Sequence, residues 1–317
     1  MNKKTANLLC LLIGVIWGGG FIATDFALKT FTPFQMLLIR FAGAALLAWI
    51  PVLVKREKVQ KEAMKTGLIS GCFLYIAFAL QTFGINLTEP GMNAFLTSVN
   101  VVLVPYLAWI VWKQKPDGLV LCASLVCMAG IGFLSLSSGS FGLRWGDLLS
   151  LGCSVFFAAQ IVALGRSEHL SVAVVNALQL STAAVLAIPF GLLEPWPAQI
   201  SMETIGSLAY TVCLSTFLCY LMQTTAQKYT SCAAASILMG TESLWANIFS
   251  FLILHQVPSV MMVTGGLLIF TAILMVEGRG WIELHLLKRR SIRQPRPAFK
   301  RSGSFRCFVL LSVFLKG

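Results

Sequence analysis

The sequence predicts an all-α membrane protein with ten transmembrane helices, arranged as two inverted five-helix repeats. Three observations carry this prediction: an apolar composition, a series of ten apolar segments, and a partial match between the two halves of the chain. Of the 317 residues, 57% are hydrophobic and only 11% are charged. Soluble domains carry about 25% charged residues, so lipid must surround most of this chain.

Apolar segments of the length needed to cross a membrane follow one another along the chain. A hydrocarbon core of roughly 30 Å takes about 20 residues per helix. Breaks that combine proline with polar residues separate several segments, as at 87–91 and 113–118. The expected spans are Ala6–Thr24, Phe34–Val54, Thr66–Asn86, Met92–Trp112, Leu119–Leu136, Asp147–Leu164, Val172–Leu193, Ile205–Thr225, Ala233–Leu254 and Val260–Val276.

Lys and Arg are distributed unequally between alternate loops. One set of loops holds Lys29 and Arg144 only. The other set holds Lys3, Lys4, Lys55, Arg56, Lys58, Lys61, Lys65, Lys113, Lys115, Arg166 and Lys228. Short loops rich in Lys and Arg face the cytoplasm. We therefore expect a multi-pass protein of the inner (cytoplasmic) membrane with an even number of spans and both termini in the cytoplasm.

The end of the chain, residues 279–317, is predicted to be a basic, disordered cytoplasmic tail. Ten of the 24 Lys and Arg residues lie there, after the last apolar segment. Such a stretch is expected to lie on the anionic leaflet. The formal net charge of +12 thus reflects membrane topology and not a nucleic-acid partner.

The two halves of the chain, residues 1–136 and 146–278, match weakly. At an offset of 142 residues, Gln81 aligns with Gln223 and Thr88 with Thr230; at an offset of 138, residues 44–51 align with 182–189. Because five spans are an odd number, the second half must enter the membrane from the opposite side. Inverted repeats are typical of secondary transporters that work by alternating access.

Glu242 is the one acidic residue deep in an expected span, since the other acidic residues fall at span ends. A charge at the bilayer centre costs about 2.5–3.5 kcal/mol on insertion scales. The carboxyl group should therefore face a cavity, pair with another group or carry a proton. We expect Glu242 to take part in proton coupling, with a hydrogen-bonded structural role as the alternative. Asn100 has the same repeat position at the offset of 142.

Arg40 is the cation inside an expected span. Arg40 could attract an anionic group of the substrate. It could also form an ion pair with Asp25 at the outer end of the first span, and this pair could act as a gate. The remaining alternative is that its side chain reaches the lipid headgroups by snorkelling. A structural or pairing role is favoured, because the headgroups lie within a short reach.

Amide and aromatic side chains inside apolar runs are the candidates for substrate binding. Buried amides seek hydrogen bonds, so some link helices and others line a solute path. The candidates are Trp17, Gln81, Asn100, Tyr106, Gln160, Gln223 and Trp245. Gly18, Gly19 and Gly20 indicate either a break in the first span or tight helix packing at the GxxxG spacing of Gly14 and Gly18.

An ordered set of short motifs resembles the drug/metabolite transporter superfamily, in its EamA-type branch. The motifs are IWGGGF around Trp17, Arg40-Phe41, FLTSVNVVLVP at 95–105, Gly146-Asp147, QTTAQ at 223–227, and Glu242. The resemblance covers about residues 6–278. It implies ten helices, cytoplasmic termini, and export or exchange of small metabolites, often amino acids or drugs, driven by protons or a counter-solute.

The sequence departs from the pattern of that branch at two places in and after the ninth span. Ser243 follows Glu242 where proline is usual, and His255-Gln256 stands where a Gly-Glu pair is usual. A coupling role that depends on the second acidic residue therefore does not carry over.

Enzyme motifs are absent from the sequence. It contains neither HExxH nor a phosphate-binding loop, and its three histidines are far apart. We expect no enzyme, no cofactor and no metal. The expected partners are a small-molecule substrate, membrane lipid, and protons or a counter-solute. A membrane-embedded enzyme or a lipid-handling protein of the same helical class is the alternative.

Overall fold

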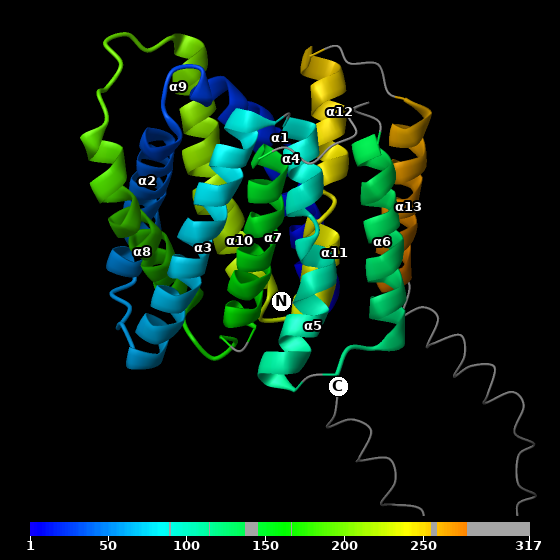
Figure 1. Ribbon diagram of the computed structural model, residues 1–317. Helices are drawn as coiled ribbons and strands as arrows, with labels where there is room; N and C mark the ends of the chain where they lie inside the picture. The colour runs from blue at the N-terminus through cyan, green and yellow to red at the C-terminus, as the bar shows by residue number, and fades with distance from the viewer. Residues whose placement is uncertain (89, 114, 137–144, 166, 255–258, 278–317) are drawn as a thin grey trace, which may run out of the picture. The chain divides into compact units, whose positions relative to one another are not determined.

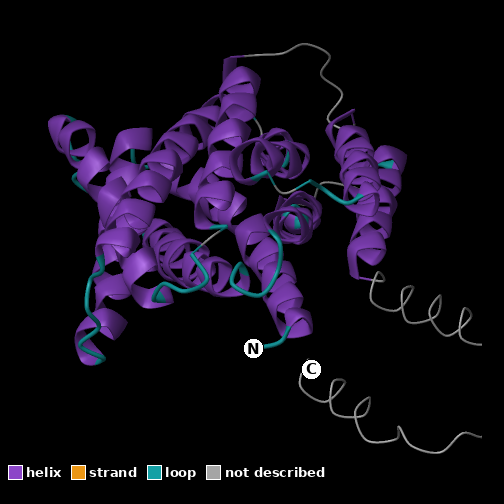
Figure 2. Ribbon diagram, turned by 90° about the horizontal axis from the view of Figure 1, so that it is seen from below, coloured by secondary structure: helices purple, strands orange, loops and turns teal. Residues whose placement is uncertain are grey.

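The computed structural model describes residues 1–277 apart from 89, 114, 137–144, 166 and 255–258 (Figure 1). The predicted basic tail at 279–317 and the His255-Gln256 pair lie outside the described residues. Every element in the described part of the chain is helical, and no strand occurs there (Figure 2). The elements are α1 (Lys3–Leu28), α2 (Pro33–Val54), α3 (Lys61–Leu87), α4 (Pro90–Thr97), α5 (Asn100–Trp112), α6 (Gly118–Leu136), α7 (Trp145–Leu164), α8 (Val172–Leu193), α9 (Met202–Ala209), η1 (Tyr210–Leu218), α10 (Cys219–Ala226), α11 (Cys232–Met239), α12 (Glu242–Leu254) and α13 (Val260–Glu277).

Eight helical segments among the described residues are long and apolar enough to cross a membrane. They are Lys3–Leu28, Pro33–Val54, Lys61–Leu87, Pro90–Trp112, Trp145–Leu164, Val172–Leu193, Met202–Ala226 and Cys232–Ile253. Shorter apolar helices, Gly118–Phe133 and Val263–Met275, lie where the fifth and tenth spans are expected. The described part of the chain is therefore all-helical, the chain is a multi-pass membrane protein, and the count of ten spans stays a prediction.

Local sequence determines where several helices begin. The side chains of Ser171, Ser201 and Ser231 accept hydrogen bonds from backbone N–H groups in the first turns of α8, α9 and α11. Thr32 and Gln35 form a reciprocal capping box at the start of α2. Each cap satisfies N–H groups that have no partner within the helix. Short loops can therefore end one span and begin the next within a few residues.

The helices pack so that the two predicted halves are interleaved. α3 packs against α7 and α8, α2 against α8, and α1 against α12 and α10. α6 and α13 lie side by side as a pair (Figure 1). Two clusters of buried apolar side chains form the interior, and Trp17 packs against both of them.

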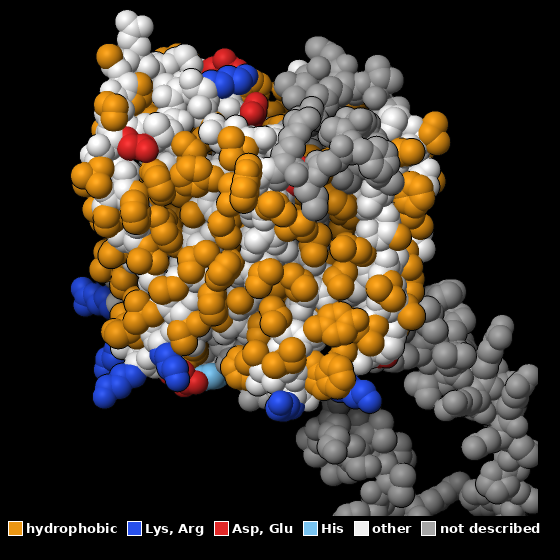
Figure 3. Space-filling model, viewed as in Figure 1, with side chains coloured by type: hydrophobic (Ala, Val, Ile, Leu, Met, Phe, Trp, Pro, Cys, Tyr) orange, Lys and Arg blue, Asp and Glu red, His pale blue; other side chains and the backbone are white. Residues whose placement is uncertain are grey.

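Side chains on the outer surface are sorted by type. Figure 3 shows a broad band of hydrophobic side chains, with Lys and Arg gathered mainly along one edge. α1 begins at this edge, which we call the N-terminal face. Exposed cations there include Lys55, Arg56, Lys61, Lys65 and Lys113. This arrangement fits a chain surrounded by lipid with one strongly basic face.

Two expected spans are interrupted at matching positions. A turn at residues 98–99 separates α4 from α5, and a turn at 240–241 separates α11 from α12. The two turns lie 142 residues apart, which is the offset that aligns Gln81 with Gln223. The fourth and ninth spans are therefore discontinuous helices in equivalent places.

The glycine-rich segment of α1 is continuous, so of the two alternatives for Gly18–Gly20 the structure has tight packing and not a break. A Cβ atom on Gly18 would lie 2.5 Å from Trp245 Cβ, and one on Gly14 would overlap the Thr241 side chain. The glycines are needed because α1 packs directly against the turn between α11 and α12. Close approach of helices through small residues is a common device in membranes.

Candidate functional site

A narrow cavity of about 30 Å³ lies inside the helical bundle. Space for one water molecule takes roughly 10–15 Å³ by the same measure, so the cavity has room for about two. Seven of the ten side chains proposed from the sequence line it: Trp17, Arg40, Gln81, Asn100, Gln160, Gln223 and Glu242. Both halves of the chain contribute to this site.

The two discontinuous helices meet the cavity at their breaks. Asn100 is the first residue of α5 and Glu242 is the first residue of α12. Ser98, in the turn before α5, donates a long hydrogen bond of 3.5 Å to Glu242 Oε1. At each break the end of one half-helix adjoins the start of the next, and backbone hydrogen bonds such as Val101 N–H to the Ser98 carbonyl continue through the turn. Discontinuous helices that frame a central site are typical of secondary transporters.

Arg40 is buried on the other part of the cavity wall, with 4% of its surface exposed. Its Nε donates to Thr216 Oγ1 at 2.6 Å and its Nη2 donates to Ser215 Oγ at 3.0 Å. The guanidinium carbon lies 4.1 Å from the centroid of the Phe78 ring. Snorkelling to the membrane surface is therefore wrong, because the side chain is held inside by two hydroxyl groups and an aromatic ring.

No ion pair joins Arg40 to Asp25. In the part of the chain that the structure describes, the ion pair found is His169–Glu62, on the N-terminal face. Asp25 is half-buried on α1 and does not line the cavity. Arg40 and Glu242 thus line one cavity as two buried ionisable groups, each without a described ion-pair partner.

The segment whose hydroxyl groups bind the Arg40 side chain is a π-helix, η1. Its Ser215 carbonyl accepts a hydrogen bond of 2.8 Å from Trp17 Nε1, and Tyr210 Oη donates one of 2.8 Å to the Ile16 carbonyl. π-Helical turns occur frequently at functional sites because they place side chains that a regular helix would turn away. η1 therefore ties α1 and Arg40 together at one side of the cavity.

A chain of amide side chains leads from the cavity toward the N-terminal face. Gln223 Nε2 donates to Gln160 Oε1 at 3.1 Å, and Gln160 Nε2 donates to Gln179 Oε1 at 3.1 Å. Gln179 Nε2 in turn donates to Asn176 Oδ1 at 3.0 Å. Gln223 Oε1 and Asn176 Nδ2 are buried without a protein partner among the described residues. Such atoms can bind water or a polar solute.

A second polar chain leads from the cavity toward the opposite face. Gln81 Nε2 donates to Thr97 Oγ1 at 3.3 Å, and Asn93 Nδ2 donates to the Gln81 carbonyl at 3.1 Å and to Ser150 Oγ at 2.7 Å. Near that face, Thr88 Oγ1 donates to Asp147 Oδ1 at 2.9 Å. The repeat-related residues Gln81 and Gln223 thus begin polar chains that run to opposite faces.

The aromatic wall of the cavity differs from the expected one. Tyr220 is fully buried beside Trp17, with ring centroids 5.5 Å apart, and its hydroxyl has no described hydrogen-bond partner. Trp245 instead lies 6.1 Å from Phe249 and against α1, and Tyr106 is 41% exposed. Neither Trp245 nor Tyr106 contributes to the lining of the cavity. Tyr220 was not predicted, because a tyrosine within an apolar segment does not stand out in the sequence.

These features define the class of protein. A multi-pass helical chain in which two equivalent discontinuous helices meet at a buried polar cavity is a membrane transporter by architecture. The EamA-like transporter family model matches residues 4–136 and again residues 144–277, so the chain belongs to the EamA-like transporter family. The predicted family is confirmed, and membership in a transporter family implies a small-molecule substrate.

Similar proteins agree with this assignment. An uncharacterized transporter of Archaeoglobus fulgidus is 30% identical over 280 residues, which cover 88% of this chain and 88% of the relative. The uncharacterized transporter YoaV of Bacillus subtilis is 21% identical over 276 residues, covering 83% of this chain and 93% of the relative. A protein of known crystal structure shares the fold, with a TM-score of 0.71 and 18% identity over 86% of this chain and 98% of that one.

Proposed function

We propose that this transporter exports or exchanges small zwitterionic metabolites, such as amino acids, across the inner membrane by alternating access. The observation that carries the proposal is the pair of buried groups Arg40 and Glu242, which line one cavity and have no ion-pair partner among the described residues. The α-carboxylate of an amino acid would bind Arg40, and its ammonium group would bind Glu242.

Energetics favour a ligand that carries both charges. An ionic group removed from water costs several kcal/mol unless a partner compensates it. Arg40 has five N–H donors, and two of them bond to Thr216 and Ser215. The remaining N–H groups can donate hydrogen bonds to a carboxylate. Truncating one partner of a buried charged pair typically costs about 2–5 kcal/mol. A solute with only one of the two charges would leave Arg40 or Glu242 uncompensated.

Alternating access is supported by the paired breaks and by the size of the cavity. With room for about two water molecules, the cavity must widen before it can hold an amino acid. The turns at 98–99 and 240–241 interrupt the regular α-helix beside Asn100 and Glu242. Movement of one half against the other about such breaks would open the polar chains on α3 and α10 in turn.

Glu242 would also link transport to protons. A proton and the substrate ammonium group would compete for the same carboxylate, so binding of one favours release of the other. Proton-driven export follows if the two enter from opposite faces. A counter-solute with an ammonium group would give exchange by the same competition.

A binding experiment with amino-acid analogues tests the proposal. Thermal stabilisation of the purified chain is measured with a panel of amino acids, their carboxamides and their N-acetyl derivatives. We expect wild type to prefer the intact zwitterion over both derivatives by about 30-fold or more, the lower end of the range for an uncompensated buried charge.

Two variants assign the charges to residues. Arg40→Gln should lose the preference over carboxamides and keep the preference over N-acetyl derivatives, and Glu242→Gln should do the reverse. A wild-type protein that binds the three analogue classes equally would contradict the proposal, provided that one member of the panel binds.

A further inference from the structure

A second, larger hollow lies on the outside of the bundle. It has a volume of about 700 Å³ and is lined by residues of α3, α5 and α7. α7 packs against both α3 and α5 (Figure 1). Ala159 and Ala163, one turn apart on α7, are small, and this leaves room between the larger side chains of the flanking helices. We call this hollow the lateral groove.

The lateral groove has the depth of one membrane leaflet. Along α3 its lining runs from Glu62 to Phe73, which is roughly 16 Å at 1.5 Å per residue. Half of a hydrocarbon core of roughly 30 Å is about 15 Å. α3 begins at the N-terminal face, and α5 and α7 end there, so the groove occupies the leaflet on that side. Its deeper lining is apolar, with Ile69, Phe73 and Leu107.

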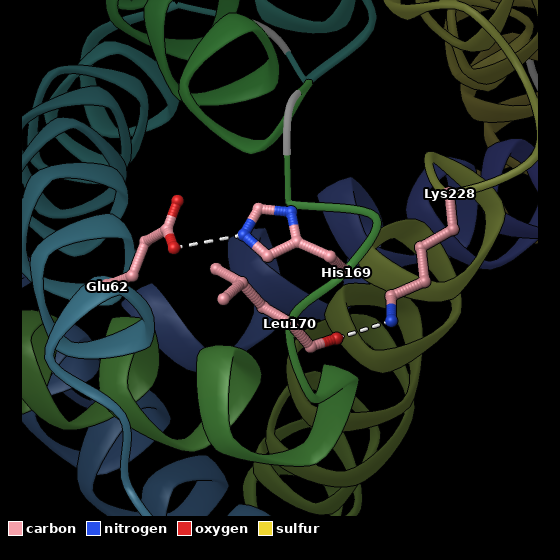
Figure 4. Close-up of polar contacts among 4 residues, drawn as sticks. All are labelled: Glu62, His169, Leu170 and Lys228. Atoms are coloured by element: carbon pink, nitrogen blue, oxygen red, sulfur yellow. Dashed lines mark hydrogen bonds and ion pairs between the residues drawn. The ribbon is translucent and has the colours of Figure 1, made fainter.

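The mouth of the lateral groove carries a cation. Lys65 lines the groove, is exposed, and has no ion-pair partner in the described part of the chain. Glu62 also lies at the mouth, but its Oε2 lies 3.1 Å from His169 Nε2 (Figure 4). Lys61 and Lys113, both exposed, are at the adjoining helix ends. Three lysines against one glutamate give the polar end of the groove an excess of positive charge, while its deeper walls are apolar.

The segment next to the mouth is fixed to two other parts of the protein. His169 contacts Glu62 at the start of α3, and the carbonyl of the next residue, Leu170, accepts a hydrogen bond from Lys228 Nζ (Figure 4). Ser171, which caps α8, donates to Glu57. These contacts connect the segment beside the mouth to the α2–α3 region and to Lys228.

We propose that the lateral groove binds one anionic phospholipid. The phosphate of the headgroup would lie at Lys65, and an acyl chain would lie along Ile69, Phe73 and Leu107. Basic pockets between transmembrane helices are known to hold anionic headgroups. A water-soluble solute would gain nothing from the apolar walls, whereas a lipid matches both the charge at the mouth and the leaflet depth of the groove.

A bound lipid would act on the transport site through α7. Ala159 lines the lateral groove, and the next residue, Gln160, lines the central cavity and donates to Gln179. The acyl chain would therefore pack against the back of the helix that carries part of the polar site. Anionic lipid would support the helix position in which this hydrogen bond forms.

Native mass spectrometry of the full-length chain in neutral detergent tests this inference. The protein is incubated with equal amounts of phosphatidylglycerol and phosphatidylcholine of the same acyl length. We expect one phosphatidylglycerol to be retained in preference to phosphatidylcholine. Lys65→Gln should lower the preference about five-fold, because one juxtamembrane lysine contributes about that factor.

Matched variants distinguish a bound lipid from a diffuse charge effect. Lys58→Gln removes the same charge from the same face outside the groove and should leave the preference unchanged. Ala163→Phe should fill the groove and reduce retention of both lipids. Ile69→Gln, at a position that is 41% exposed, provides a milder second test if Ala163→Phe does not fold.

Three results would overturn the inference. Equal retention of the two lipids by wild type would remove the role of charge. An equal effect of Lys58→Gln and Lys65→Gln would point to the basic face as a whole. Full retention in both Ala163→Phe and Ile69→Gln would show that lipid binds elsewhere.

Discussion

At Gly18, a substitution by alanine sets the cost of overpacking against the gain in helix propensity. In Gly18→Ala, the new Cβ would lie 2.5 Å from Trp245 Cβ and 2.8 Å from the backbone nitrogen of Ala246. Ordinary contacts begin near 3.4 Å. α1 and α12 must therefore separate by close to 1 Å, because the atoms that are met belong to the backbone and to a Cβ and cannot turn aside.

The expected change in the free energy of unfolding follows from two opposing effects. Alanine favours a helix interior over glycine by about 0.8–1 kcal/mol. Overpacking a well-packed contact costs about 1–3 kcal/mol. Because rigid atoms are met, the upper part of that range applies to Gly18→Ala, and the net loss should be about 1–2 kcal/mol. Transport should fall further, since α12 begins at Glu242.

The assay compares Gly18→Ala with a matched glycine elsewhere. An alanine Cβ at Gly132 on α6 would meet no heavy atom within 4 Å, so Gly132→Ala should keep or slightly raise the melting temperature in detergent. Gly18→Ala should melt several degrees lower and show reduced substrate transport at equal abundance. If Gly18→Ala melts as high as Gly132→Ala and transports normally, α1 does not need close contact with α12.

Three further predictions concern coupling, topology and the tail. Glu242→Gln should abolish the dependence of vesicle transport on an imposed pH gradient and leave only weakened exchange, since the amide cannot pair with an ammonium group; unchanged gradient dependence at normal abundance would reduce Glu242 to a structural role. Alkaline phosphatase fused after Glu277 should be inactive in cells, because the basic loops predict a cytoplasmic end; an active fusion contradicts the ten-span topology. Deletion of 284–317 should leave membrane abundance and transport near wild type, and loss of the protein would make that segment structural.

The boundaries of some spans could be predicted closely where local chemistry determines them, while α1 and α3 extend three to five residues beyond the start of the expected segments. The expected segment Val172–Leu193 coincides with α8, which Ser171 caps. The turns at 98–99 and 240–241 were not predicted, because each interrupts an apolar run for only two residues and leaves the mean hydropathy high. The glycines of α1 gave the stronger signal for a break, yet in the fold they provide space for the break in another helix.

The site could be predicted in part, because a polar group inside a span is costly and needs a reason. This rule found Arg40, Gln81 and Glu242. It missed Tyr220 and Ser215, since phenols and hydroxyls are common in spans and carry little cost there. The orientation of side chains around the helix axis was also not predictable. The sequence indicates how deep a side chain lies in the membrane but not which residue it will contact.

Tyr106 and Trp245 show why this orientation was not predictable. Six residues separate Tyr106 from Asn100, which places their side chains about 120° apart around α5 at 3.6 residues per turn. Tyr106 therefore points outward while Asn100 lines the cavity. Trp245 is one turn from Glu242, but its Cβ lies against the Gly18 position on α1.

The two charges of the proposed site come from different halves of the chain, and this has a consequence for mechanism. Arg40 belongs to the first half and Glu242 to the second, where the repeat position of Glu242 is held by the neutral Asn100 in the first half. A zwitterion that binds both residues would therefore connect the halves, whereas a solute with one charge would bind one half only. A ligand can shift a conformational equilibrium only by its difference in affinity for the two states. On the proposed function, the division of charge between the halves would make the zwitterion the solute best able to favour the closed state through which it crosses the membrane.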